Sequence, residues 1–478
     1  MAPPSAPHVL MFPFMAQGHT LPLLDLSKVL ASKNIKVTIL TTPSNAKSIL
    51  DKVAVFNNIH LVEIPFPAID GLPEGCENTS QLPSLDFHFP FLLATKKLQT
   101  PFEKVLQNMK YSQNLPSFVI SDFFLGFTLY SCRAFGVPRL VFHGMSALTM
   151  AIIKSSLVHN PHLKSKSDSD PLDLPGLKLP FVVTTPDLPI EVVEFSDLHS
   201  PMTQFLSEVG EADLNSWGVV VNSFAEIEMG QVSSFEAFYT KGCLAWCVGP
   251  LNLYNKGLDL DSSLHTKWLN EQEKNSVLYV SFGSQADLSE AQLDEVAFGL
   301  EDSEQSFIWV VRSKTWSPPN GMKERIKNRG LIISEWVDQR HILSQNAIGG
   351  FLSHCGWNSC LESLSSGVPI LAWPLFAEQS LNAKVIVEGL ESGLRISRKA
   401  GFGLESGVVS RQMICRGARE LMKGEKGKQV RERAEALGVA AKQAVEEGGS
   451  SHRTLDEMLE KLLHVEIVLK KNDKSTSF

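Results

Sequence analysis

The stretch WVDQRHILSQNAIGGFLSHCGWNSCLESLSSGVPILAWPLFAEQ, from Trp336 to Gln379, decides the fold of this chain. It contains two short apolar runs, Ile348 to Ser353 and Pro369 to Trp373, on either side of a helical pattern that begins near Asn358. A strand, a helix and a second strand in this order are typical of a parallel βαβ unit. The stretch therefore predicts a buried parallel sheet with polar turns at the ends of its strands.

Apolar runs of the same kind occur along most of the chain and alternate with helical patterns. In the first half we expect strands at His8 to Phe14, Ile35 to Thr41, Leu61 to Ile64, Phe118 to Ser121, Arg139 to Phe142 and Val219 to Asn222. In the second half we expect them at Val277 to Phe282, Phe307 to Val311, Leu331 to Ser334, Ile348 to Ser353 and Pro369 to Trp373. This α/β pattern, which restarts once, predicts two doubly wound domains.

The boundaries of these domains follow from composition. Residues 1–248 form the expected N-terminal domain, and residues 249–263 (GPLNLYNKGLDLDSS) are a turn-rich linker. Residues 264–450 form the second domain. Residues 451–478 are expected to form a helix, whose apolar face packs back on the N-terminal domain, and a polar tail. A proline-rich stretch, Asn160 to Pro189, is expected to be a surface loop of the first domain, either a simple tether or part of an acceptor site.

Composition excludes several classes of protein. The 478 residues carry a formal net charge of -8, which disfavours nucleic acid as a partner. The seven cysteines are odd in number and show no CxxC spacing, so free thiols in a reducing compartment are expected. The N-terminus lacks the pattern of a secretory signal, and no apolar run reaches the roughly 20 residues that span a bilayer. We expect a cytoplasmic monomer without an integral membrane segment.

The turn after Ser353 has the chemistry of a phosphate site. A helix that starts after a parallel strand presents unpaired backbone N–H groups and the positive end of its dipole, which suits a diphosphate. Gly356 allows close backbone approach, and His354, Asn358 and Ser359 can add side-chain donors. Further groups suited to a nucleotide sugar lie at or beyond strand ends, where ligands of open α/β sheets bind: Trp336, Glu362, Glu378 and Gln379.

These 44 residues, with GGF, HCGWNS, ES, GVP and EQ in register, resemble the signature box of the plant family 1 UDP-glycosyltransferases. The resemblance extends to FGS at Phe282 to Ser284 and GGSS at Gly448 to Ser451. It implies a GT-B fold, in which two Rossmann-like domains face each other across a cleft. Two positions depart from the family pattern, because Asp338 replaces the usual Pro and Gln345 the usual His.

The resemblance also implies a role for each residue of the donor site. Trp336 would stack on uracil and Val337 would meet it through backbone groups. Gln339 and Glu362 would hold the ribose, and His354, Asn358, Ser359 and Ser284 the diphosphate. Trp357, Glu378 and Gln379 would face the sugar, and Gln379 in the last position favours glucose.

A histidine and an aspartate complete the predicted site. His19 follows the first strand and Asp122 ends the strand from Phe118, so both lie at the carboxyl edge of one sheet. A lone histidine at such a turn is more often structural. A buried carboxylate needs a partner, however, and Asp122 could orient His19 as the base that deprotonates an acceptor hydroxyl. The resembled family uses this pairing.

The resulting prediction is an inverting, metal-independent enzyme without a cofactor. It would transfer a sugar, glucose above all, from a UDP-sugar to a hydroxyl of a flavonoid, another phenolic or a terpenoid, and give a β-glycoside. The alternatives are transfer from UDP-galactose or UDP-xylose, and a non-catalytic UDP-sugar-binding protein. An epimerase or a phosphorylase would share the architecture. A dinucleotide-dependent oxidoreductase is disfavoured because the first turn, PFMAQGHT, lacks GxGxxG.

Overall fold

A computed structural model describes residues 7–195, 199–254, 264–286, 288–313, 315–396 and 408–475, with residue 85 and residues 464–475 described by their backbone alone. The chain divides into two compact units. The first consists of Met1–Ala147, Asp197–Asn255 and Ala444–Phe478, and the second of Leu148–Ser196 and Lys256–Gln443.

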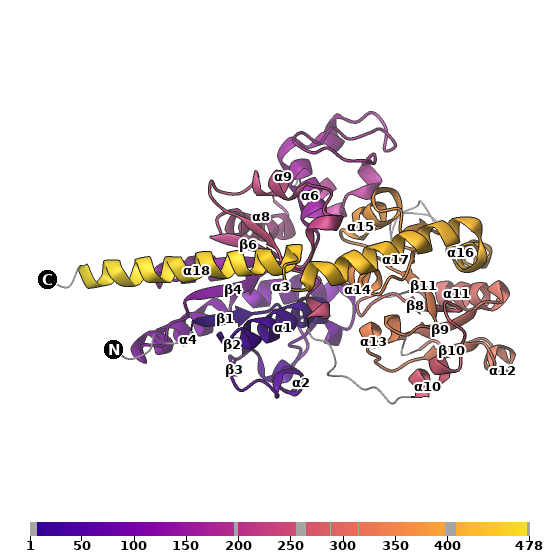
Figure 1. Cartoon of the computed structure of the whole chain (residues 1–478), viewed down its shortest axis with the longest axis horizontal. Coiled ribbons are helices and arrows are strands. Elements are labelled where there is room, and N and C mark those ends of the chain that lie inside the picture. The colour runs from indigo at the N-terminus through magenta and orange to yellow at the C-terminus, as the bar shows by residue number, and fades with distance from the viewer. Residues whose placement is uncertain are drawn as a thin grey trace. The chain divides into compact units, whose positions relative to one another are not determined.

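The first unit contains a sheet whose described strands are all parallel and lie in the order β3-β2-β1-β4-β5-β6-β7 (Figure 1). Strands β1, β4 and β5 are buried along their whole length, including the polar residues at the end of β4 and at both ends of β5. The strands are β1 (His8–Phe12), β2 (Lys36–Thr41), β3 (Ile59–Glu63), β4 (Phe118–Asp122), β5 (Arg139–His143), β6 (Gly218–Val221) and β7 (Ala245–Cys247).

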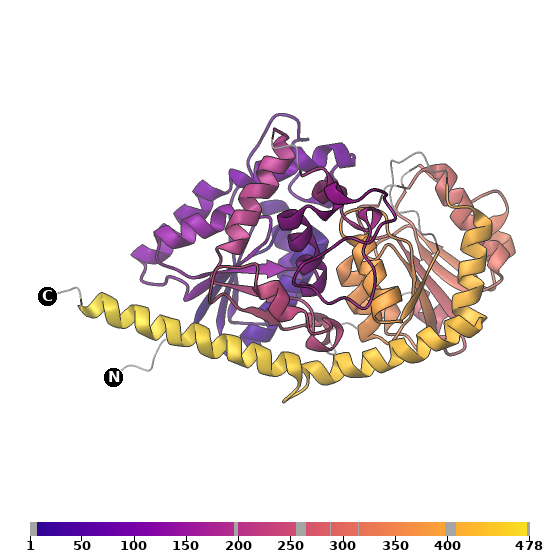
Figure 2. The same cartoon turned by 90° about the horizontal axis from the view of Figure 1, so that it is seen from above.

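Helices cover this sheet and bury its side chains in two apolar clusters. One cluster includes Leu455, Met458, Leu459 and Leu462 of the C-terminal helix α18, which pack with Val9 and its neighbours. Figures 1 and 2 both show α18, in yellow, alongside the strands of this unit. The helices are α1 (Gln17–Ser32), α2 (Pro43–Val53), α3 (His88–Lys96), α4 (Gln99–Tyr111), α5 (Phe127–Ala134), α8 (Pro201–Leu214), α9 (Val232–Glu236) and α18 (Ser450–Ser475).

The second unit contains another sheet of parallel strands, in the order β10-β9-β8-β11-β12-β13 over the described residues. Its strands are β8 (Val277–Ser281), β9 (Ser306–Val310), β10 (Gly330–Ile333), β11 (Ile348–Ser353), β12 (Ile370–Ala372) and β13 (Gly393–Arg395). The two sheets repeat one topology, since each starts in its centre, extends to one edge and then crosses back to the other side of its first strand. Both units are therefore Rossmann-like, and together they give the GT-B fold.

The helices of the second unit enclose a core of apolar side chains on both faces of the sheet. They are α6 (Ala147–His159), α7 (Ile190–Val193), α10 (Leu264–Asn270), α11 (Glu290–Ser303), α12 (Met322–Ile326), α13 (Gln339–Leu343), α14 (Trp357–Ser365), α15 (Gln379–Lys384), the π-helical turn η7 (Val385–Gly389), α16 (Arg411–Lys423) and α17 (Glu425–Val445).

The strands expected from the sequence all occur, with ends that differ by one or two residues. Strands β7 and β13 were not expected. Each is three residues long and lies at a sheet edge, so it lacks the longer apolar run by which the others are recognised. Of the expected linker 249–263, residues 255–263 lie outside the described part of the chain.

The proline-rich stretch is the main difference from the expected domain organisation. The sequence places residues 148–196 in the N-terminal domain, whereas the structure groups them with the second unit. Side-chain contacts explain this grouping. Lys384 of α15 pairs with Asp187 at 2.9 Å and donates to the carbonyl of Val182, and Thr149 donates to Asn382 at 3.1 Å. Asp187 and Lys384 are both buried, so this ion pair is shielded from solvent.

Candidate functional site

Both sheets have a topological switch point, where chain connections leave in opposite directions and ligands of open α/β sheets bind. In the first unit it lies between β1 and β4, and in the second between β8 and β11. His19 follows β1 and Asp122 ends β4. Gly283 follows β8 and His354 follows β11. The predicted catalytic pair and the predicted phosphate site thus occupy equivalent places in the two units.

The structure brings His19 and Asp122 into direct contact. His19 Nδ1 lies 2.8 Å from Asp122 Oδ2, although the two residues are 103 positions apart in sequence. The second carboxylate oxygen, Oδ1, accepts a hydrogen bond from the backbone N–H of Phe124 at 3.0 Å. The Asp122 side chain is 1% exposed and that of His19 is 31% exposed. The carboxylate is therefore fixed, and the imidazole can reach a ligand through Nε2.

Aromatic rings surround His19 within the first unit. Phe14 and Phe124 have ring centroids 5.3 and 5.6 Å from the imidazole, and Phe14 contacts Phe91 of α3 at 5.8 Å. His88, one turn before Phe91 on the same helix, has its pKa lowered by burial and by the neighbouring His19. The wall beside the imidazole is thus apolar, with one further imidazole near it. These residues come from separate loops and helices, and none was predicted individually as a site residue, although His88 and Phe91 lie in the stretch Gly71 to Phe91 that was expected to shape the acceptor pocket.

The predicted phosphate subsite is built around His354. Helix α14 begins at Trp357 with Gly356 as its N-cap, so its first backbone N–H groups follow directly after His354. Burial lowers the pKa of His354 to about 4, with a smaller opposing effect from the backbone of Ser281. The imidazole is therefore neutral at pH 7. It can donate a neutral N–H to a phosphate oxygen, next to the positive end of the α14 dipole.

Two glycines make room for this imidazole. A Cβ atom on Gly356 would lie 2.5 Å from His354 Nε2, and one on Gly283 would lie 2.8 Å from both Cε1 and Nε2. Gly283 also has a φ of 82°, which favours glycine. The FGS turn and the HCGWNS turn therefore close on the same ring. The exposed Ser284 is the next residue of the FGS turn.

The residues predicted to hold the ribose form one hydrogen-bonded group. Gln339 Nε2 donates to Ser359 Oγ at 2.9 Å and to Glu362 Oε2 at 2.7 Å. Arg340 Nε donates to the other oxygen of Glu362 at 2.9 Å. Arg340 was not predicted, although its place beside Gln339 on a short helix was a possible signal. Glu362 is 8% exposed and anchored on both oxygens, so its position is set before any ligand binds.

Trp336, which is predicted to stack on uracil, and Asp338 lie just before this group in the sequence. Trp336 is 53% exposed and Val337 is 8% exposed, so an open indole face stands next to a buried side chain. Asp338, which replaces the usual Pro, is the N-cap of α13, and its Oδ1 accepts from the backbone of Arg340 at 2.9 Å. Gln345, the second departure, donates to His341 Nε2 and to the His341 carbonyl, each at 3.1 Å. Both departures therefore supply local hydrogen bonds to α13.

One of the residues predicted to face the sugar, Glu378, is held by Asn382, which was not predicted. Asn382 is fully buried, and its Nδ2 donates to Glu378 Oε1 at 3.1 Å and to the carbonyl of Cys355 at 3.0 Å. Gln379 Oε1 accepts hydrogen bonds from two backbone N–H groups of the preceding turn, at 2.9 and 3.1 Å. The residue is 4% exposed. Trp357 is only 2% exposed. A role of Trp357 at the sugar would therefore fall to its backbone N–H.

Replacing Asn382 by Ala should weaken both the fold and the recognition of the sugar. It leaves the buried carbonyl of Cys355 and the hydroxyl of Thr149 without this partner, which costs about 1–3 kcal/mol. It also releases Glu378. We expect a lower Tm and a raised KM for the UDP-sugar, with little change in the Kd of UDP. Thr149→Val, which removes only one of the three contacts, is the matched control. An unchanged KM in a folded Asn382→Ala variant contradicts the positioning role.

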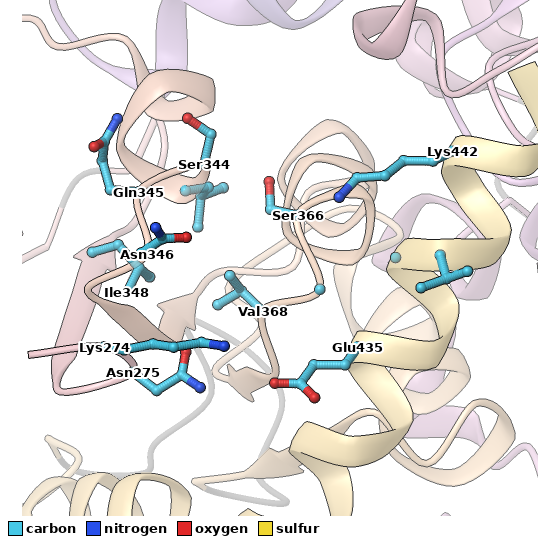
Figure 3. Close-up of a pocket in the computed structure, with 14 residues that line it drawn as sticks. Lys274, Asn275, Ser344, Gln345, Asn346, Ile348, Ser366, Val368, Glu435 and Lys442 are labelled. Atoms are coloured by element: carbon cyan, nitrogen blue, oxygen red, sulfur yellow. The ribbon is translucent and has the colours of Figure 1, made fainter. Parts of the chain in front are cut away.

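A separate hollow of about 240 Å³ lies elsewhere in the second unit (Figure 3). It is near the start of β8 and β11, at Asn275 and Ile348, and so at the opposite edge of the sheet from His354. Figure 3 shows Glu435 and Lys442 of α17 reaching it from one side and Gln345 from the other. None of the residues predicted for the donor lines it.

Two Rossmann-like sheets with polar groups gathered at both switch points define an enzyme that binds a nucleotide-linked substrate. Comparison with known proteins identifies the family of this enzyme. A model of the UDP-glucoronosyl and UDP-glucosyl transferase family matches residues 252–398. UDP-glycosyltransferase 73B4 of Arabidopsis thaliana is 38% identical over 95% of this chain and 98% of its own length. Scopoletin glucosyltransferase of Nicotiana tabacum is 37% identical over 95% and 97%. The chain belongs to the plant family 1 UDP-glycosyltransferases.

Solved structures agree over nearly the whole chain. UGT73P12 of Glycyrrhiza uralensis, complexed with glycyrrhetinic acid 3-O-monoglucuronide, has a TM-score of 0.87 at 29% identity, with 98% of each chain covered. UGT2 of Phytolacca americana, complexed with UDP-2fluoro-glucose and pterostilbene, has a TM-score of 0.80 at 31% identity, with 96% of this chain and 100% of that chain covered. Within the described residues, no helix is long and apolar enough to cross a membrane.

Proposed function

We propose that this enzyme transfers glucose from UDP-glucose to a hydroxyl group of a small, largely apolar plant metabolite such as a flavonoid, another phenolic or a terpenoid. The observation that carries the proposal is the 2.8 Å contact between His19 Nδ1 and the buried Asp122. A partly exposed imidazole that is oriented by a fixed carboxylate and bordered by phenylalanine rings suits the deprotonation of an apolar alcohol or phenol.

The chemistry follows from the tautomer that Asp122 selects. With the proton on Nδ1 held by the carboxylate, Nε2 of His19 is the basic nitrogen. Nε2 takes the proton of the acceptor hydroxyl while the acceptor oxygen forms a bond to the anomeric carbon. The bond from that carbon to the diphosphate oxygen breaks, and its electron pair leaves with UDP. Direct displacement inverts the anomeric centre, so an α-linked donor gives a β-glycoside.

The second unit supports the donor part of the proposal. We assign uracil to Trp336 and the backbone of Val337, ribose to Gln339 and Glu362, and diphosphate to His354, Asn358, Ser359 and Ser284. We assign the sugar to Glu378, Gln379 and the backbone of Trp357. Neutral donors and the α14 N-terminus can stabilise the charge that develops on the leaving diphosphate, so we propose that transfer needs neither a metal ion nor a cofactor.

Relatives favour glucose and a phenolic acceptor over the alternatives. The tobacco relative is named for glucosylation of scopoletin, and the Phytolacca enzyme was solved with a fluoroglucose donor and pterostilbene. Gln379 ends the donor stretch, and Gln at this position is commonly associated with glucose donors in the family. UDP-galactose and UDP-xylose remain the alternative donors. The acidic composition and the cysteines, all of them free, support a monomer in the cytoplasm.

The test is acceptor-dependent release of UDP. The full chain is incubated with UDP-glucose, UDP-galactose or UDP-xylose and a panel of phenols, flavonoids and terpenoids, with and without EDTA. We expect UDP and a β-glucoside in proportion, fastest with UDP-glucose and unaffected by EDTA. Donor binding without a product from any acceptor would support the non-catalytic alternative, and loss of activity in EDTA would overturn the metal-independent mechanism.

A further inference from the structure

A layer of buried polar side chains lies beneath the predicted catalytic pair, and it centres on Arg139. Arg139 is the first residue of β5 and is 2% exposed. Its guanidinium donates from Nε to Ser121 Oγ at 2.8 Å, from Nη1 to Ser216 Oγ at 2.5 Å, and from Nη2 to the carbonyl of Asp122 at 3.2 Å. The arginine is thus bonded to both residues that end β4, one of which is the partner of His19.

A second buried carboxylate faces the same layer. Asp213 of α8 is fully buried, and it accepts hydrogen bonds from His143 Nε2 at 2.8 Å and from Tyr239 OH at 2.9 and 3.0 Å. Burial and Asp213 raise the pKa of Tyr239 well above its usual value, so the phenol stays protonated and donates. Ser216, which accepts from Arg139, donates its backbone N–H to the carbonyl of Asp213 at 3.1 Å, so Arg139 and Asp213 belong to one buried layer.

The pKa of Arg139 reflects this arrangement. Burial lowers it, and the charges of Asp213 and Asp122 oppose that effect. The guanidinium also donates to the carbonyl of Asp122 at 3.2 Å, so its positive charge lies beside the residue that orients His19. The other titratable groups around the layer are His143 of β5, Tyr239, and Cys132 of α5, whose pKa burial raises to about 12. On the far side of Asp122 are His19 and His88.

The same layer also touches the catalytic loop through aromatic rings. His143 lies 5.1 Å from the ring of Phe123, Phe123 lies 5.4 Å from Phe124, and Phe124 lies 5.6 Å from His19. The turn that carries Asp122, Phe123 and Phe124 is therefore held from below by Arg139 and from the side by His143. A shift of Arg139 would move the backbone that orients the dyad.

We propose that Arg139 is a positioning residue and the buried counter-charge of the His19–Asp122 pair, and that Asp213 moderates its effect by sharing that charge. This inference rests on the proposed role of His19 as the base. A nearby fixed positive charge favours the resting state, in which Asp122 is anionic and His19 neutral, over the state in which His19 has become an imidazolium. Arg139 thereby keeps the base unprotonated at a lower pH than the dyad alone would allow.

The sign of the expected effect differs between two substitutions. Arg139→Met removes the positive charge, so the His19–Asp122 pair binds a proton more readily. The acid limb of the pH profile, where kcat falls as the pH is lowered, should therefore move to higher pH by about one unit. Asp213→Asn removes the competing carboxylate and leaves the full charge of Arg139 for the dyad. Its acid limb should move to lower pH. A purely structural role for this layer predicts lower activity in both variants and no such opposite shifts.

The experiment measures kcat from pH 4.5 to 9 with saturating UDP-glucose and acceptor, for the full chain and four variants. Arg139→Lys keeps the charge and should keep the position of the acid limb, whatever happens to kcat. Ser216→Ala removes one hydrogen bond to the guanidinium without changing its charge, and serves as the matched control. The Kd of UDP and the near-ultraviolet circular dichroism spectrum confirm that each variant is folded.

The outcomes separate this inference from the proposed function. A wild-type acid limb in folded Arg139→Met, or a shift of the same sign in Asp213→Asn, overturns the role of Arg139. If Arg139→Met does not fold, the other two variants decide. A displaced acid limb in Arg139→Lys, or an unmoved one in Asp213→Asn, would also overturn the proposed role of Arg139. The residual activity of His19→Ala tests the base itself. An acid limb that persists there overturns the assignment of His19, whatever the Arg139 variants show.

Discussion

His19→Ala is expected to abolish transfer while leaving donor binding intact. A positioned general base contributes about 10²- to 10⁴-fold to a rate, and the alanine variant should lose kcat by that factor. The Kd of UDP should not change, because the residues assigned to UDP all lie in the second unit. Steady-state UDP release and calorimetric titration of UDP measure the two quantities.

Asp122→Asn is the companion variant. Asn can still contact His19, but it carries no charge to stabilise the imidazolium and can hold the ring in the wrong tautomer. We expect a loss in kcat of the same order, again without an effect on the Kd of UDP. Loss of UDP binding in either variant would mean that the pair supports the fold rather than the reaction. Full activity in His19→Ala would remove the base from the mechanism.

Gly283→Ala is expected to have the largest effect on the donor side. Its Cβ would lie 2.8 Å from two atoms of the His354 imidazole, so the ring must leave its place at the N-terminus of α14. Loss of a hydrogen bond to a charged phosphate costs about 1.5–3 kcal/mol, which corresponds to a tenfold to hundredfold increase in the Kd of UDP. Calorimetric titration of UDP is the measurement.

Gly136→Ala is the matched control for this substitution. Gly136 has a φ of 69°, close to the 82° of Gly283, but a Cβ there meets nothing within 4 Å. Both alanine variants carry the strain of a left-handed backbone, about 1–2 kcal/mol, and both should lower Tm. Only Gly283→Ala should weaken the binding of UDP. Equal UDP affinity in the two variants would show that the imidazole can yield without cost, and that His354 is not a phosphate ligand.

The residues proposed for the donor could be grouped from the sequence because most of them lie in one nearly continuous stretch. Gln339, Ser359 and Glu362 lie within 24 residues, and the structure joins them by hydrogen bonds of 2.7 and 2.9 Å. The contacts that two further residues make with this site were not predicted. Arg340 fixes Glu362 by an ion pair, and Gly283 approaches His354 from another strand. Arg340 lies beside Gln339 on a short helix, which was a possible signal, whereas the approach of Gly283 to His354 has no local signal.

The sequence by itself determined the two parallel sheets and the donor stretch. An apolar strand, a glycine turn and a helix are set by neighbouring residues, and their hydrophobic periodicity is visible without any long-range contact. It also supplied His19 and Asp122 as candidates, because each follows a predicted strand. The sequence also predicted that the two could pair, but the contact of 2.8 Å between side chains 103 residues apart comes from the structure.

Only the tertiary structure decided which distant side chains meet. The strand order places β1 beside β4, and this pairing brings His19 to Asp122. The packing of the first unit brings the guanidinium of Arg139 against Ser121, Ser216 and the carbonyl of Asp122, and 233 residues separate Thr149 from its partner Asn382 in the second unit. Such contacts depend on how layers pack. The physical reason is that a buried charge or polar group must find a partner in space, wherever the chain supplies one.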